Sequence, residues 1–196
     1  LKNIRNPYPE RFEITHDLNV ASKLEDGIIG VRIAGHIIFM RKMGKMSFLA
    51  LQDIKGRMQV SIKVDCIGEE KYEFFKNYID LGDFIGVEGE VFTTHTGEKT
   101  IRASKLEFLG KALKPLPEKF HGLEDIETIY RQRYLDLIMN EESRKVFLFR
   151  SKFVQELRNY LNNEGYIEIE TPILNTKASG AIAKPFVLYA GGSIHI

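Results

Sequence analysis

The sequence has little cysteine: Cys66 is the only one among its 196 residues. One cysteine cannot form an internal disulfide, and with neither a second cysteine nor a paired His-x₃-His spacing the chain offers no zinc site. It has no run of about 18 or more apolar residues, which a membrane-spanning helix needs. Residues 1–11 lack the apolar stretch and the small-residue cleavage pattern of a secretory signal. These absences predict a cytoplasmic protein with no membrane partner.

Motifs of common catalytic sites are also missing. The sequence contains no glycine-rich phosphate loop of the Walker or dinucleotide type, no Gly-x-Ser-x-Gly, and no pair of carboxylates spaced for acid–base chemistry. We therefore assign no catalytic residue and no metal ligand within the chain. The composition, 43% hydrophobic and 28% charged residues, is that of a globular chain able to bury a core.

Five short runs rich in Val, Ile, Phe and Leu follow one another between residues 31 and 110, mostly separated by glycine-containing turns: VRIAGHIIFM, SFLALQD, RMQVSIKV, DFIGVEGEVF and TIRASKLEFL. Between the third and the fourth, Tyr72, Phe75 and Ile79 recur at helical spacing and predict a short amphipathic helix. Three strands, a helix and two strands is the order of an OB-fold, a five-stranded barrel that binds oligonucleotides. We predict this fold for residues 31–110, after a helical or extended segment at 1–30.

Positive charge is concentrated in the first half of this barrel. Residues 31–64 contain seven Lys or Arg and one acid, Asp53. If Leu49 and Leu51 face the core, Phe48 faces outward, where an aromatic ring can stack on a nucleobase; a core position for Phe48 is the alternative. Cations of the first loop can hold phosphates, as we expect of Lys42 and Lys45.

The second part of the chain is predicted to be mainly helical at its start. Residues 111–123 contain two prolines and no periodicity, and are interpreted as a linker. A helix is predicted from Glu141 to Asn163, with Asn140 as its N-cap and Gly165 just beyond its end. Its apolar side chains recur every three or four residues: Val146, Phe149, Phe153, Leu157 and Leu161. The alternation in residues 167–171 predicts a strand that Pro172 ends.

Three stretches, VRIAGHIIFMRKMGKMSFLALQDIKGRMQV, KPLPEKFHGLEDIETIYRQRYLDLI and GYIEIETPIL, closely resemble class II lysyl-tRNA synthetases. The resemblance runs from about Asn19 to Phe186. It implies an α+β protein in which an OB-fold binds the tRNA anticodon and residues 124–196 begin a catalytic domain. In that family the enzyme activates lysine with ATP and Mg²⁺ and transfers it to lysine tRNA. GYIEIETP is similar to the family's motif 1, which implies a homodimer interface including Phe153, Leu157 and Pro172.

The resemblance also implies roles for individual residues. Phe48 matches the aromatic residue that stacks on the central anticodon uridine, and Arg41, Gln59 and Glu98 match residues that contact anticodon bases. Without the resemblance, Glu98 would be taken for a solvated charge in a hairpin turn. Gly180 matches a glycine that borders the lysine and adenylate pocket, where the absence of a side chain permits close approach.

Two departures from the family pattern stand out. His36 replaces an arginine, which weakens a contact near neutral pH because histidine is then mostly uncharged, and Ser179 replaces the first glycine of a Gly-Gly-Ala loop. The ATP-binding arginines of motifs 2 and 3 are not among the 196 residues, so we expect this chain alone to be inactive. Three alternatives stay open: an aspartyl or asparaginyl synthetase, a non-catalytic RNA-binding relative, and a dimerising fragment.

Overall fold

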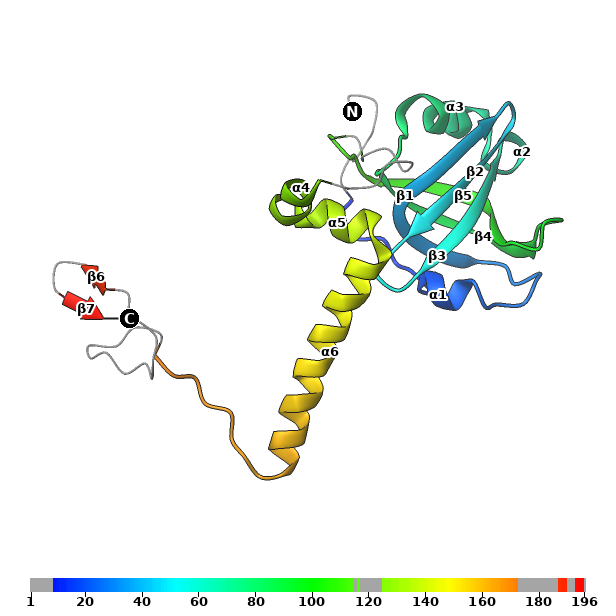
Figure 1. Ribbon diagram of the computed structural model, residues 1–196. Helices are drawn as coiled ribbons and strands as arrows, with labels where there is room; N and C mark the ends of the chain where they lie inside the picture. Colours follow the sequence, from blue (N-terminus) through cyan, green and yellow to red (C-terminus); the bar gives the residue numbers. More distant parts are fainter. Residues whose placement is uncertain (1–8, 115, 117–124, 173–186, 190–192, 196) are drawn as a thin grey trace. The chain divides into compact units, whose positions relative to one another are not determined.

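A computed structural model describes residues 9–114, 116, 125–172, 187–189 and 193–195 (Figure 1). The chain divides into two compact units, Leu1–Glu118 and Lys119–Ile196. Strands dominate the described part of the first unit and helices that of the second. This mixture agrees with the α+β class predicted from the sequence.

Five strands of the first unit close into a barrel in the order β1-β2-β3-β5-β4, with β3 and β5 parallel and the other neighbours antiparallel. The predicted OB-fold is therefore confirmed, and no strand end differs from its expected position by more than three residues. The strands are β1 (Val31–Met43), β2 (Met46–Gln52), β3 (Arg57–Lys63), β4 (Phe84–Thr93) and β5 (Lys99–Gly110).

The predicted helix of the barrel is α3 (Glu69–Tyr78), and its apolar stripe packs into the core. Tyr72 is 3% exposed, while Phe75 and the following Ile79 are fully buried. The sequence did not predict α2 (Val64–Ile67), a single turn that precedes α3. The short helix α1 (Leu18–Ala21) adds two buried residues to the same core.

Strand β1 has an irregularity between Ile37 and Phe39 that changes which side chains face the core. Before it, the odd-numbered residues Ile33 and Ile37 are fully buried; after it, the even-numbered Met40 packs against the core. An extra residue in one strand reverses the alternation beyond it. Phe39 and Arg41 consequently lie on the outer surface of the barrel.

A buried carboxylate fixes the chain where it leaves β5. Asp83 has no exposed surface and accepts hydrogen bonds from the backbone N–H of Asp80 and of Ala112, both at 2.8 Å, and from the Lys111 ammonium at 2.9 Å. Burial acts to lower the pKa of Lys111, but hydrogen bonds with Asp80 and Asp83 outweigh it and raise that pKa above the ordinary 10.5. The start of the predicted linker is thus held against the barrel.

The described part of the second unit begins with helices α4 (Ile126–Arg131), α5 (Arg133–Met139) and α6 (Glu141–Asn163). Helix α6 has the predicted bounds. The side-chain oxygen of Asn140 accepts hydrogen bonds from the N–H groups of Glu142 and Ser143, at 3.1 and 3.4 Å, and Gly165 has a φ of 89°. The cap and the terminating glycine are both confirmed.

The strand predicted at residues 167–171 is not found. Residues 166–172 form no regular secondary structure, and Ile167 and Ile169 are 85% and 75% exposed. Alternation shows which side chains share a face, but a strand also needs a neighbour to accept and donate its backbone hydrogen bonds. Among the described residues, the only pair of strands in this unit is β6 (Val187–Tyr189) with β7 (Ser193–His195).

Candidate nucleic-acid interface

The orientation of strand β2 decides whether Phe48 can contact a ligand. Leu49 and Leu51 are fully buried, whereas Phe48 is only half-buried. Successive side chains of a strand point to opposite faces. The expectation that Phe48 lies on the outer surface is therefore confirmed, and the alternative of a core position is wrong.

Phe48 belongs to a row of side chains that crosses the barrel surface. It lies directly opposite Arg41 of β1 and Ser61 of β3, and Ser61 is paired with Arg102 of β5. Paired residues of neighbouring strands point to the same face. The ring of Phe48 thus has Arg41 on the neighbouring strand β1. On its other side, Arg102 lies in the same row on β5, two strands away.

The next row contains Gln59 of β3, and the side chain of Gln59 is hydrogen bonded to Glu98 in the β4–β5 turn. Phe39, Ala50, Gln59 and Thr100 are paired in register. Gln59 donates from Nε2 to a Glu98 carboxylate oxygen at 2.7 Å, and its carbonyl accepts from the Thr100 hydroxyl at 2.6 Å. The amide of Gln59 is therefore held in one orientation.

The β4–β5 turn that carries Glu98 is fixed at its base. Asp26 accepts hydrogen bonds from the Lys99 ammonium at 2.7 Å and from the Thr93 hydroxyl at 2.9 Å. These bonds lower the pKa of the Asp26 carboxyl below its ordinary 3.8. Thr94 also closes the turn by accepting from the Glu98 N–H at 3.1 Å. The backbone that carries Glu98 is thus bound both to the Asp26 segment and across the turn.

The two lysines expected to hold phosphates differ in position. Lys42 lies on the same side of β1 as the core residue Met40, and its ammonium donates to the backbone carbonyls of Lys76 and Ile79, at 2.7 and 3.3 Å. Lys45 is exposed at the β1–β2 turn. The structure brings Arg41, Phe48, Gln59 and Glu98 onto one surface, which we call the Phe48 face, and places Lys42 away from it.

Arg102 was missed by the sequence reasoning. Its guanidinium lies 4.6 Å from the centre of the Phe92 ring and is 3.1 Å from a Glu90 carboxylate oxygen. The signal was present in TIRASKLEFL, because Ile101 and Ala103 are buried and the residue between them must face outward. Arg102 adds a second guanidinium to the Phe48 face, and this one is held by Glu90 and Phe92.

His36, the departure on β1, also lies on the outer surface. It is half-buried, and its ring is tilted against Phe84 with centroids 5.2 Å apart. Gly180 and Ser179 lie outside the described residues.

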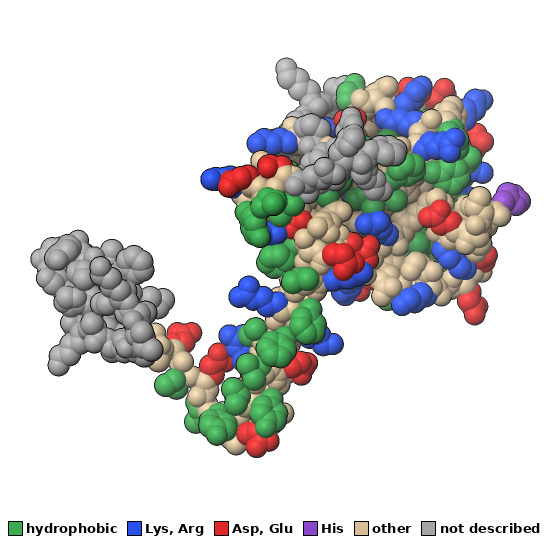
Figure 2. Space-filling view, in the orientation of Figure 1, with side chains coloured by type: hydrophobic (Ala, Val, Ile, Leu, Met, Phe, Trp, Pro, Cys, Tyr) green, Lys and Arg blue, Asp and Glu red, His purple; other side chains and the backbone are tan. Residues whose placement is uncertain are grey.

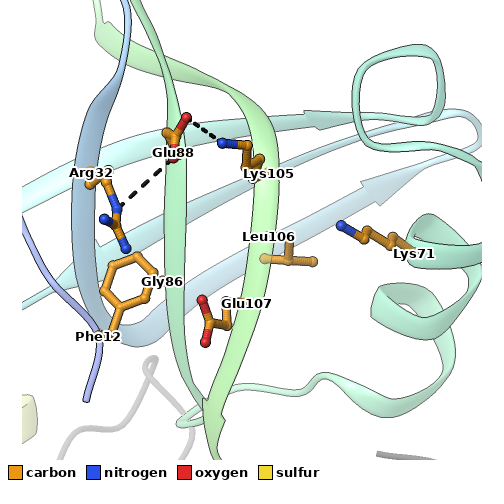
Figure 3. A pocket seen from close by; sticks show the side chains of 8 residues that line it. All are labelled: Phe12, Arg32, Lys71, Gly86, Glu88, Lys105, Leu106 and Glu107. Atoms are coloured by element: carbon orange, nitrogen blue, oxygen red, sulfur yellow. Dashed lines mark hydrogen bonds and ion pairs between the residues drawn. The ribbon is translucent and has the colours of Figure 1, made fainter. Parts of the chain in front are cut away.

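A separate hollow of about 480 Å³ lies on the β1-β4-β5 side of the barrel (Figure 3). The ring of Phe12 rests on Gly86, where an added Cβ would come within 2.5 Å of it, and the Arg32 guanidinium lies 4.8 Å from that ring. Glu88 pairs with both Arg32 and Lys105, at 3.9 and 2.8 Å. Because its aromatic ring is already covered and two of its cations are paired, this hollow suits nucleic acid less well than the Phe48 face.

Helix α6 exposes the apolar residues expected at a dimer interface. Phe153 is 57% exposed and Leu157 47%, and the ring of Phe149 stacks on that of Phe153 with centroids 6.3 Å apart. Figure 2 shows hydrophobic side chains along this helix. Pro172 is exposed beyond it. Within the described part of the chain nothing buries this stripe.

Membrane-spanning helices and clusters of metal-binding side chains are absent from the described residues. No helix there is long and apolar enough to span a bilayer. No group of three or more His, Cys, Asp or Glu side chains there is placed to hold a metal ion.

Comparison with known proteins finds two family matches, one in each of the two compact units of the chain. Residues 31–109 match the family described as OB-fold nucleic acid binding domain, and residues 125–193 match tRNA synthetases class II (D, K and N). The chain belongs to the class II tRNA synthetases. Curated relatives at about 47% identity align with nearly all of it, so the similarity includes both units.

These relatives are named lysine–tRNA ligase. The protein from Lysinibacillus sphaericus is 47% identical over 96% of this chain and 39% of its own length, and that from Streptococcus pneumoniae is 48% identical over 94% and 39%. The protein from Aquifex aeolicus is 52% identical over 81% of this chain and 27% of its own length. The chain thus spans about two fifths or less of the relatives' length.

Proposed function

We propose that this chain supplies the anticodon-recognition surface of a lysine–tRNA ligase. The observation that carries the proposal is the Phe48 face, where four residues matched to anticodon contacts lie on adjacent rows of one barrel surface. The relatives' names supply the amino acid. We propose the cytoplasm as the compartment.

On this surface each residue has a distinct task. The half-buried ring of Phe48 stacks on the central uridine, an interaction that contributes roughly 1–3 kcal/mol per base. Gln59, oriented by Thr100 and Glu98, presents hydrogen-bonding groups to a base edge, where an amide can both donate and accept. Arg41 contacts an anticodon base and, together with Lys45, attracts the phosphate backbone, while Arg102 offers a further planar donor.

The reaction proposed for the whole enzyme is the activation of lysine with ATP and its transfer to lysine tRNA, with Mg²⁺ as the metal. Gly180 is proposed to border the lysine and adenylate pocket. We expect the 196-residue chain, assayed by itself, to bind the tRNA without forming lysyl-adenylate, a step that needs preorganised positive charge around the α-phosphate.

Helix α6 is proposed to form a homodimer interface with a second copy of the chain, including Phe153, Leu157 and Pro172. Its exposed apolar stripe is the supporting observation, because such surface is usually covered by a partner. Sedimentation of the chain at increasing concentration should show a dimer, and Leu157→Asp should shift it toward the monomer. A wild-type chain that stays monomeric at all concentrations would remove this part of the proposal.

Binding of the chain to a lysine-tRNA anticodon stem-loop tests the main proposal. The wild type should prefer the natural loop over one whose central uridine is replaced by cytidine, and Phe48→Ala should lose most of that preference. Salt should weaken all complexes, since phosphate contacts release counterions. Equal binding to both loops would instead indicate a nonspecific cationic barrel.

A further inference from the structure

We propose that Phe39 is a second base-stacking residue of the Phe48 face, and that it stacks on a nucleotide adjacent to the one that Phe48 holds. This inference rests on the proposed anticodon function. It extends that function to a position that neither the sequence motifs nor the comparisons assign.

The irregularity of β1 turns Phe39 toward the ligand. A strand that continued the alternation of Ile33 and Ile37 would point Phe39 into the core, but the extra residue between Ile37 and Phe39 reverses the alternation. Phe39 is 47% exposed, so its ring lies on the outer surface of the barrel.

The surroundings of Phe39 fit a nucleobase. It is paired with Ala50, a small residue, and Ala50 is paired in turn with Gln59. A base stacked on Phe39 would therefore lie in the same row as an oriented amide. Arg41, two residues farther along β1, points to the same face and is exposed, so it can contact the phosphate.

The separation of these two residues on the paired strands suits neighbouring nucleotides. Phe39 is the diagonal neighbour of Phe48, since Phe48 is paired with Arg41. Diagonal neighbours of an antiparallel pair are roughly 7–8 Å apart. Consecutive nucleotides of a single strand whose bases are splayed out can contact two aromatic rings at that separation.

The experiment compares Phe39→Ala, Phe39→Leu and Phe39→Tyr with the wild-type chain, using a lysine-tRNA anticodon stem-loop as probe. Two further probes carry an abasic nucleotide on either side of the central uridine. Phe39→Ala and Phe39→Leu should each weaken binding of the intact loop by about 5- to 150-fold, while Phe39→Tyr, which keeps the aromatic face, should bind like the wild type. One of the two abasic loops lacks the base on which Phe39 is proposed to stack. With that loop, the wild type and Phe39→Ala should bind equally.

Two controls make the outcome decisive. Tyr78→Ala removes a ring of similar exposure, 53%, from α3 and should leave binding unchanged. Phe48→Ala is measured beside it: if this variant loses uridine preference while Phe39→Ala binds like the wild type, the inference fails and the proposed function stands. If neither variant has an effect, both fail. A loss in Phe39→Ala that persists with both abasic loops, or full binding by Phe39→Leu, would also overturn the stacking role.

Discussion

Arg41 and Lys42 are adjacent cations of β1, but we expect Arg41 to affect RNA binding and Lys42 to affect the stability of the fold. Arg41 lies on the Phe48 face, whereas Lys42 donates to the backbone carbonyls of Lys76 and Ile79 around the carboxyl end of α3. Replacing Lys42 by alanine removes two charge-assisted hydrogen bonds and a favourable cation at a helix end. Because Lys42 is exposed, we expect the free energy of unfolding to fall by only roughly 1–2 kcal/mol.

Arg41→Ala should instead leave stability within about 0.5 kcal/mol of the wild type, as for most surface substitutions. It should reduce the salt dependence of RNA binding, since each phosphate contact to a single strand contributes about 0.7 to the slope of log K against log salt. Between about 50 and 200 mM salt, the variant should therefore lose roughly 2.6-fold less affinity than the wild type.

Urea unfolding and stem-loop binding at several salt concentrations measure both properties on the same two variants. We expect Lys42→Ala to lower the urea midpoint without changing the salt slope. Arg41→Ala should reduce the salt slope without changing the urea midpoint. If Lys42→Ala changes the slope while Arg41→Ala does not, the reversal of alternation in β1 is wrongly placed and the two faces are exchanged.

Three other predictions concern the barrel itself. Gly86→Ala should lower the thermal midpoint, because its Cβ would lie 2.5 Å from the Phe12 ring, and adding Phe12→Ala should recover most of the loss. Asp83→Ala should reduce the free energy of unfolding by about 3–5 kcal/mol, measured in urea, since the ion pair of this fully buried carboxylate is broken and backbone donors are left unsatisfied. The lowered pKa of Asp26 stabilises the folded state at pH values above its ordinary 3.8, and this contribution is lost as pH falls through the folded value. Asp26→Asn should therefore destabilise the chain at pH 7 and have little effect near pH 2.

Local patterns were enough to predict most of the fold. The alternation of apolar residues located five strands, and the spacing of Tyr72, Phe75 and Ile79 located α3. Asn140 and Gly165 marked the ends of α6 correctly because capping depends on residues close in sequence. These features need no knowledge of distant contacts.

Features that depend on distant contacts could not be predicted in the same way. The reversal in β1 arises from pairing with β2, so the sequence alone did not show that Arg41 faces outward and Lys42 does not. The hydrogen bond between Gln59 and Glu98 joins residues 39 positions apart. The alternating segment at 167–171 has the pattern of a strand, but no neighbouring strand is present among the described residues.

Mapping the RNA contact directly on the protein tests the central claim. Backbone amide chemical shifts of the ¹⁵N-labelled chain would be followed while a lysine-tRNA anticodon stem-loop is added. We predict the largest changes at Arg41, Phe48, Gln59 and Glu98, with little change around Phe12 and the hollow beside it. Changes concentrated at that hollow, or spread evenly over the barrel, would contradict the claim that the Phe48 face reads the anticodon.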